Sequence, residues 1–233
     1  MLYSIAGTLN SIFIFVSLVG IWSQLQKVWT RKRDGLLNEG PTNILSLNQF
    51  TVSFLAYWSF FVYGYSITPF NHFIVWPRLI ASAMVLMILY EIFVDRKTQA
   101  SSIALAVAVL LMVAGLFGLA FGGTFVDEGR IVSQSLIVVV TILLAQGYAH
   151  QIRLILASGK TGAVSLKMSQ FILSMDVTTI IFAFVMGLET GWPLLLLASV
   201  SATTKLIIMW LFSWEKHSPV AKQRREGQAR IVV

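Results

Sequence analysis

The chain has 233 residues, of which 57% are hydrophobic and only 12% are charged. Soluble globular proteins carry about 25% charged residues, so this composition excludes an ordinary water-soluble enzyme. The absence of cysteine excludes disulfide scaffolds, thiol catalysis and thiolate metal sites. The three histidines, His72, His150 and His217, show no metal-ligand spacing, and we therefore expect neither a metal nor another cofactor.

Long apolar stretches account for almost the whole chain. A membrane-spanning helix needs about 20 mostly apolar residues, because the hydrocarbon layer is about 30 Å thick. Seven stretches satisfy this condition: 4–23, 43–65, 73–94, 100–121, 132–154, 166–187 and 191–213. The first stretch lacks the small-residue cleavage pattern of a signal peptide, so we expect it to be retained. The sequence thus predicts an all-α transmembrane fold of seven helices.

The distribution of Lys and Arg predicts the orientation, because these residues favour the cytoplasmic side. Fourteen of the 17 fall on one side of the predicted membrane, while Arg78 and Arg130 fall on the other and Lys205 lies inside a span. We therefore place the N-terminus outside and the C-terminus in the cytoplasm, in a plasma or bacterial inner membrane. Residues 215–233 are interpreted as a basic cytoplasmic tail beside anionic lipid rather than a nucleic-acid-binding segment. Arg78 and Glu91, near the two ends of the third span, are expected to snorkel to water.

A short pattern, Gly-x3-Gln-x10-Gly, occurs twice, 127 residues apart, and each copy runs into a basic loop. The copies are Gly20, Gln24 and Gly35, and Gly147, Gln151 and Gly162. The third and seventh spans also open on the same dipeptide, at Trp76-Pro77 and Trp192-Pro193. We therefore predict two parallel three-helix repeats, 1–97 and 125–214, joined by a linker helix in 98–124 and followed by the tail.

This 3+1+3 arrangement, with a Gln where the first helix of each repeat meets a basic loop, resembles the PQ-loop superfamily and its SWEET sugar-transporter branch. The resemblance covers residues 4–213, although Ser23 and His150 stand where the family has Pro before the Gln. It implies transport of a small, sugar-like polar solute by alternating access between the two repeats.

The resemblance also implies that the Gly and Gln residues of the repeated pattern take part in gating. Gly20 and Gly147 weaken a helix locally by about 1 kcal/mol relative to Ala, and they also allow close helix packing. A hinge and a packing notch are therefore both open for these glycines. Gln24 and Gln151 carry donors and an acceptor that can bridge helix ends or hold a loosened carbonyl.

Two ionisable residues, Asp176 and Lys205, lie inside predicted spans of the second repeat. Their predicted depths differ by only about 4 to 5 Å, and a charge near the bilayer centre costs several kcal/mol unless it is paired or hydrated. We expect both side chains to face inward, either as a proton or zwitterion site or as a static ion pair between helices. When Gly64 is matched to Gly187, Ser53 stands in the first repeat where Asp176 stands in the second.

In the SWEET branch the solute is held by side chains of the second and third helix of each repeat. This resemblance places Trp58 near a lining position, with Ser199 as a third-helix candidate, although Trp58 also suits packing among aromatic neighbours. The third and seventh spans contain no Asn, the residue that the branch uses on its third helices. The expected substrate-binding residues are Trp58, Ser53, Asp176, Lys205 and Ser199.

Other functions remain open at this point. They are a proton-coupled carrier of amino acids or other zwitterions, a non-transporting membrane scaffold, and a seven-helix retinal protein built on Lys205. An enzyme is not expected, because the sequence offers no Ser-His-Asp set, no paired carboxylates on one side of the membrane and no phosphate cradle. The expected partners are a small solute and the lipid bilayer, with a homo-oligomer as a compatible assembly and no nucleic acid.

Overall fold

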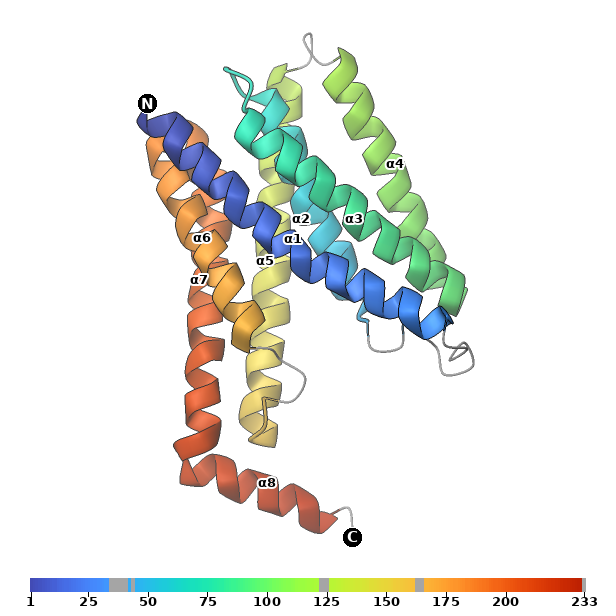
Figure 1. Ribbon diagram of the computed structural model, residues 1–233, viewed down its shortest axis with the longest axis vertical. Helices are drawn as coiled ribbons and strands as arrows, with labels where there is room; N and C mark the ends of the chain where they lie inside the picture. Colours follow the sequence, from blue (N-terminus) through green and yellow to red (C-terminus); the bar gives the residue numbers. More distant parts are fainter. Residues whose placement is uncertain (34–41, 43–44, 122–125, 162–165, 232–233) are drawn as a thin grey trace. The chain divides into compact units, whose positions relative to one another are not determined.

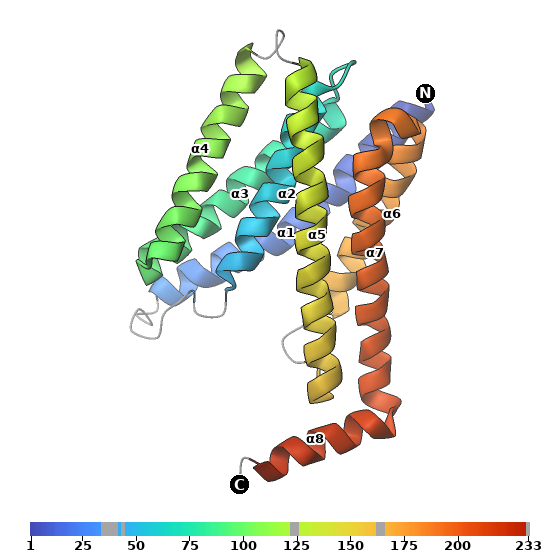
Figure 2. The ribbon, with the colours of Figure 1, turned by 180° about the vertical axis from the view of Figure 1, so that it is seen from behind.

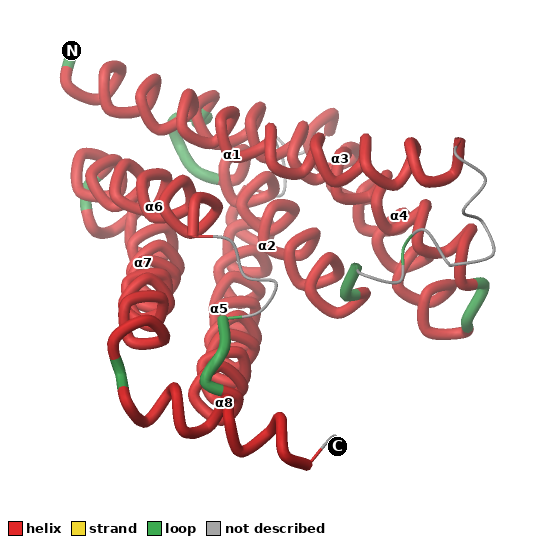
Figure 3. Tube along the Cα trace, turned by 60° about the horizontal axis from the view of Figure 1, so that its bottom comes forward, coloured by secondary structure: helices red, strands yellow, loops and turns green. Residues whose placement is uncertain are grey.

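The structure is a computed structural model that describes residues 1–33, 42, 45–121, 126–161 and 166–231. Over these residues the chain is helical and contains no strand (Figure 3). The described helices are α1 (Leu2–Arg33), α2 (Leu47–Ser66), α3 (His72–Arg96), α4 (Gln99–Phe121), α5 (Val126–Ser158), α6 (Leu166–Met186), α7 (Leu188–His217) and α8 (Pro219–Ile231). The predicted all-α fold is confirmed for this part of the chain.

Six of the helices, α1 and α3 to α7, are long and apolar enough to cross a membrane. They indicate an integral, multi-pass membrane protein. The predicted span 43–65 corresponds to α2, which is not among the six. Its 20 residues include Asn48, Gln49 and several Ser and Tyr, and 11 of them are buried against other parts of the protein. Since α2 exposes little of its surface, it needs less apolar character than a helix surrounded by lipid.

The chain divides into two units, residues 1–140 and 141–233, and the boundary falls inside α5. The first unit holds α1 to α4 and the start of α5, and the second holds the rest of α5 with α6, α7 and α8. The predicted repeats, 1–97 and 125–214, stay a prediction beside this division by contacts. The helix predicted as a linker, α4, packs against α2 and α3 and so belongs to the first unit.

In the first unit α3 contacts α1, α2 and α4 (Figure 1). A methyl group on Gly7 of α1 would lie 2.4 Å from the ring of Phe73, so this approach requires a glycine. Pro77 lacks an N–H and therefore leaves the carbonyl of Phe73, four residues earlier, without its helical donor. Ser11 of α1 donates a hydrogen bond to that carbonyl at 3.1 Å. The carbonyl of Phe73, which has no helical donor because of Pro77, thus binds α1 to α3 through Ser11.

The interior between α2 and α3 is aromatic and contains a cation. Arg78 is only 5% exposed, and its guanidinium lies 5.5 Å from the ring centre of Tyr57 and 5.2 Å from that of Phe60. The prediction that Arg78 snorkels to water is therefore wrong. Arg78 stays inside because the faces of the aromatic rings of α2 attract its guanidinium group, and burial strengthens this attraction.

In the second unit α6 and α7 pack along one another, and α8 follows α7 after a sharp turn at Ser218 (Figure 2). Pro219 starts α8 at a position where its missing N–H costs nothing. Ala221 of α8 is fully buried against the rest of the unit. The segment predicted as a basic cytoplasmic tail thus contains a helix, and this helix is docked on the unit at Ala221.

Candidate functional site

The second unit holds a cluster of polar side chains from α5, α6 and α7, in which the members from α6 and α7 are buried. Asp176 of α6 is 2% exposed, and Lys205 of α7 is 7% exposed. The ammonium nitrogen of Lys205 lies 4.3 Å from the ring centre of Tyr148 in α5. Asp176 interacts electrostatically with both Lys205 and Tyr148. The prediction that Asp176 and Lys205 face the protein rather than lipid therefore agrees with their burial.

Helix periodicity explains how α7 supplies two members of this cluster. Ser201 and Lys205 are four residues apart, so they lie on one face of the helix, one turn from each other. The side chain of Ser201 is buried and lies close to the hydroxyl of Tyr148. Ser199, six residues before Lys205, projects from a different face of α7 and is only half-buried. The structure thus brings Ser201, rather than Ser199, to the charged pair.

The cluster offers complementary chemistry for a small polar solute. Lys205 can donate to a carboxylate, Asp176 can accept from an ammonium or hydroxyl group, and the face of Tyr148 attracts a cation. Charged groups inside apolar membrane helices are costly and mark functional sites by default. Sequence reasoning missed Tyr148 and Ser201. The position of Tyr148 next to Gly147, and the spacing of four between Ser201 and Lys205, were the available indications.

The predicted site residues of the first unit lie in α2. Ser53 is half-buried. Trp58 is 6% exposed and its indole N–H donates to the carbonyl of Leu111 in α4 at 2.6 Å. A methyl group on Gly115 would lie 2.7 Å from the same indole nitrogen, so α4 covers the indole closely. This environment favours packing, one of the two roles expected for Trp58.

Trp58→Phe tests this interpretation. The change removes the N–H that donates a hydrogen bond to the carbonyl of Leu111, and it keeps an aromatic ring. We therefore expect the free energy of unfolding to fall by about 1 kcal/mol. Thermal unfolding in detergent measures this loss. Solute exchange per folded molecule should stay within about two-fold of the parent, since loss of one neutral hydrogen bond away from a ligand changes stability alone. A large change in solute affinity would instead restore Trp58 to the binding site.

The predicted gating residues lie within continuous helices, α1 and α5. A methyl group built on Gly20 or Gly147 would meet no described atom within 4 Å, so close packing does not require either glycine. This finding favours the hinge over the packing notch. Gln151 is half-buried, whereas the side chain of Gln24 lies outside the described part of the chain, as do Gly35 and Gly162.

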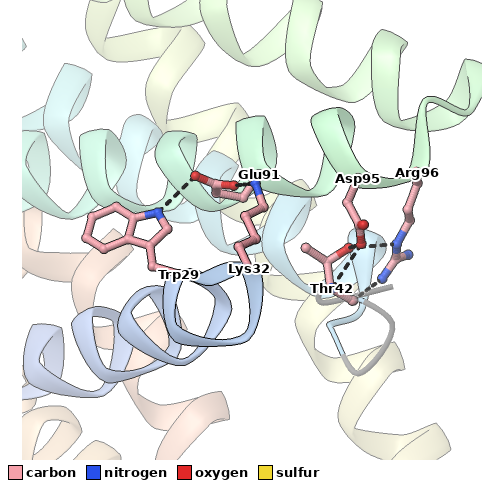
Figure 4. Close-up of polar contacts among 6 residues, drawn as sticks. All are labelled: Trp29, Lys32, Thr42, Glu91, Asp95 and Arg96. Atoms are coloured by element: carbon pink, nitrogen blue, oxygen red, sulfur yellow. Dashed lines mark hydrogen bonds and ion pairs between the residues drawn. The ribbon is translucent and has the colours of Figure 1, made fainter. Parts of the chain in front are cut away.

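In each unit a carboxylate of the third helix accepts two hydrogen bonds from a threonine. Sequence reasoning missed this contact. In the first unit Thr42 donates its backbone N–H, at 2.9 Å, and its hydroxyl to Asp95 of α3 (Figure 4). In the second unit Thr161 donates the same two groups to Glu215 of α7, at 3.1 and 2.6 Å. We call these contacts the threonine clasps. The recurring Thr-x3-Ser-Leu at residues 42–47 and 161–166 was their indication in the sequence.

The clasps supply a register for comparing the two units. Counted from the threonines, Tyr57 and Asp176 are both 15 residues further along. In this register Tyr57 corresponds to Asp176, whereas matching Gly64 to Gly187 gives Ser53, and Tyr57 faces the buried cation Arg78. Gly187, used for the earlier match with Gly64, instead precedes the first turn of α7 with φ 88°. Each second helix thus places one side chain toward a buried cation of its third helix.

Comparison with known proteins does not assign the chain to a family: no family model and no curated protein matches it.

Proposed function

We propose that this protein is a membrane transporter for a small polar solute that works by alternating access between two three-helix repeats, as the resemblance to the PQ-loop superfamily and its SWEET branch implies. In this proposal the protein lies in the plasma membrane or a bacterial inner membrane. Its N-terminus lies outside and its C-terminus lies in the cytoplasm. Six apolar membrane-spanning helices provide the setting. The observation that carries the proposal is the cluster of the buried Asp176 and Lys205 with the half-buried Tyr148.

The repeated threonine clasps support a duplicated architecture. In both units the third helix also contacts the first and the second: α3 contacts α1 and α2, while α7 packs on α6 and reaches α5 through Lys205 and Tyr148. Parallel three-helix repeats of this kind occur in transporters whose solute site lies near the bilayer midplane. A duplicated unit with a buried charged cluster suits a carrier, because charged groups inside membrane helices mark functional sites by default.

A zwitterion is the second candidate solute, in place of a neutral sugar. Opposite charges in one cluster match the carboxylate and ammonium groups of an amino acid, and a buried carboxylate can also carry a coupled proton. The packing of Trp58 against α4 removes one aromatic surface on which a sugar ring would stack. Asp176 and Lys205 therefore favour a zwitterion carrier coupled to protons.

Counterflow in proteoliposomes tests both solute classes. Vesicles are loaded with a neutral sugar or a zwitterionic amino acid, and uptake of the labelled solute is followed with and without a pH step. If Asp176 couples solute to protons, Asp176→Asn is expected to abolish the response to the pH step, and any exchange that remains should not depend on pH. Glu189→Gln, which changes an exposed carboxylate of α7, is the matched control and should behave as the parent. Transport by Asp176→Asn identical to that of the parent at every pH would show that this carboxylate plays no part in coupling.

A further inference from the structure

The end of the first unit at which α1 and α3 finish is closed by side chains of α3. Glu91 accepts a hydrogen bond from the indole N–H of Trp29 at 2.9 Å and forms an ion pair with Lys32, both on α1 (Figure 4). Glu91 therefore does not simply snorkel to water, as predicted from its place in the span. One turn further along, Asp95 makes the threonine clasp. Two successive turns of α3 thus fix the end of α1 and the segment before α2.

At the corresponding end of the second unit, the described residues of α7 supply the clasp but no link like that of Glu91. Glu215 corresponds to Asp95, and Leu211, four residues earlier, therefore corresponds to Glu91. Leu211 is fully buried and its side chain has no acceptor. Counting 127 residues from Trp29 and Lys32, the spacing that relates Gly20 to Gly147, leads to Leu156 and Gly159. Neither of these residues has a polar side chain, so the link made by Glu91 has no side-chain equivalent in α5 and α7.

The missing link is replaced by α8. Arg224 donates to the carbonyl of Leu156, and Nη1 of Arg225 donates to the carbonyls of Gly159 at 2.9 Å and Glu215 at 2.8 Å. The two arginines thus bind the very positions that correspond to Trp29 and Lys32. Arg225 also joins the end of α5 to α7.

The carbonyl groups at the ends of α5 and α7 are suited to bind arginine side chains. Carbonyls in the last turn of a helix lack intrahelical donors, and cationic side chains are favoured beside them by the helix dipole. Gly159 has φ 67°, a conformation that favours glycine. A methyl group there would also lie 2.5 Å from the carbonyl oxygen of Ala221, so the backbones of the two segments are in direct contact. The end of α5 is therefore shaped to receive α8.

We propose that α8 is a positioning element of the second unit, in which Arg224 and Arg225 tie the end of α5 to α7 as Glu91 ties α1 to α3 in the first. The difference is one of attachment. Glu91 belongs to α3 itself, whereas the arginines belong to a separate helix that joins α7 at Ser218. In this proposal, undocking of α8 releases the end of the second unit. The consequence for turnover rests on the proposed transport function, but the docking of α8 does not.

Cysteine labelling tests the docking alone, because the chain contains no cysteine. Ala221 is fully buried while the adjacent Lys222 is exposed. In permeabilised membranes we expect a maleimide to modify Ala221→Cys at least about 10-fold more slowly than Lys222→Cys, because α8 must first undock. Adding Arg224→Gln and Arg225→Gln to Ala221→Cys should remove this protection. Adding Lys216→Gln and Lys222→Gln, which removes the same charge from exposed positions, should preserve it. Equal labelling rates at 221 and 222 in the parent background would overturn the proposal.

Counterflow of the same arginine variant tests the positioning role. Arg224 and Arg225 contact backbone carbonyls and not the charged cluster, so we expect the half-saturating solute concentration to stay unchanged. Turnover should fall by about 3-fold or more, a typical effect of weakening a coupling contact. Loss of protection at Ala221→Cys with unchanged turnover would overturn the positioning role. If the parent chain exchanges no solute while the protection persists, the proposed transport function fails and the docking of α8 stands.

Discussion

Lys205→Met is expected to lower solute exchange by at least about 10-fold, since truncating one partner of a buried charge pair costs several kcal/mol. The change keeps a long unbranched side chain but removes the ammonium group over the ring of Tyr148. It also leaves Asp176 without that positive charge, so the free energy of unfolding should fall by about 3 kcal/mol. Counterflow in proteoliposomes and thermal unfolding in detergent measure the two effects.

A double variant separates a solute site from a static ion pair between helices. Buried ion pairs are often replaced by apolar residues at little cost, so Lys205→Met combined with Asp176→Leu should recover most of the lost stability. If the pair only joins α6 to α7, exchange should recover together with stability. If the pair binds solute or protons, as we propose, exchange should stay lost in a chain that folds normally. Lys216→Met, an exposed lysine of the same helix, is the control for the loss of charge.

The helices of this protein follow from its sequence because apolar length is a property of composition. The spans 73–94 and 100–121 lie within one to two residues of α3 and α4 at each end. The extra length of α1, which continues ten residues beyond its predicted end to Arg33, has a different origin. These residues are mostly polar, but Leu25 and Val28 among them are buried in the core of the first unit. The contact of Trp29 and Lys32 with Glu91 in α3 adds to this burial. Such a contact depends on partners about 60 residues away and has no local periodicity.

The candidate site was predictable only in part for the same reason. Asp176 and Lys205 stand out because a charge in an apolar span is costly wherever it points. Tyr148 and Ser201 do not stand out, because hydroxyls are common in membrane helices and their role depends on what lies opposite. Trp58 shows the converse, since a resemblance can suggest a position in a chain but not the neighbour, here Leu111, that the side chain contacts.

The second large effect is expected at Gly191 of α7. A methyl group there would lie 2.1 Å from the carbonyl oxygen of Ala183 in α6, far inside van der Waals contact. The obstacle is backbone and cannot rotate away, so Gly191→Ala must push α6 and α7 apart. Overpacking of this kind is expected to lower the free energy of unfolding by about 3 kcal/mol. Thermal unfolding in detergent, followed by tryptophan fluorescence, is expected to show the loss as a clearly lower melting temperature.

Gly147→Ala makes the same chemical change where no described atom lies within 4 Å. In a helix interior this change is expected to stabilise the fold by up to about 1 kcal/mol through helix propensity alone. Opposite shifts in melting temperature for the two variants would therefore show that contact between α6 and α7, and not glycine itself, sets the effect at Gly191. Gly147→Ala then becomes a direct probe of gating. If α5 bends at Gly147 during transport, the stiffer helix lowers turnover in a protein that is at least as stable as its parent, and unchanged turnover removes the hinge from the mechanism.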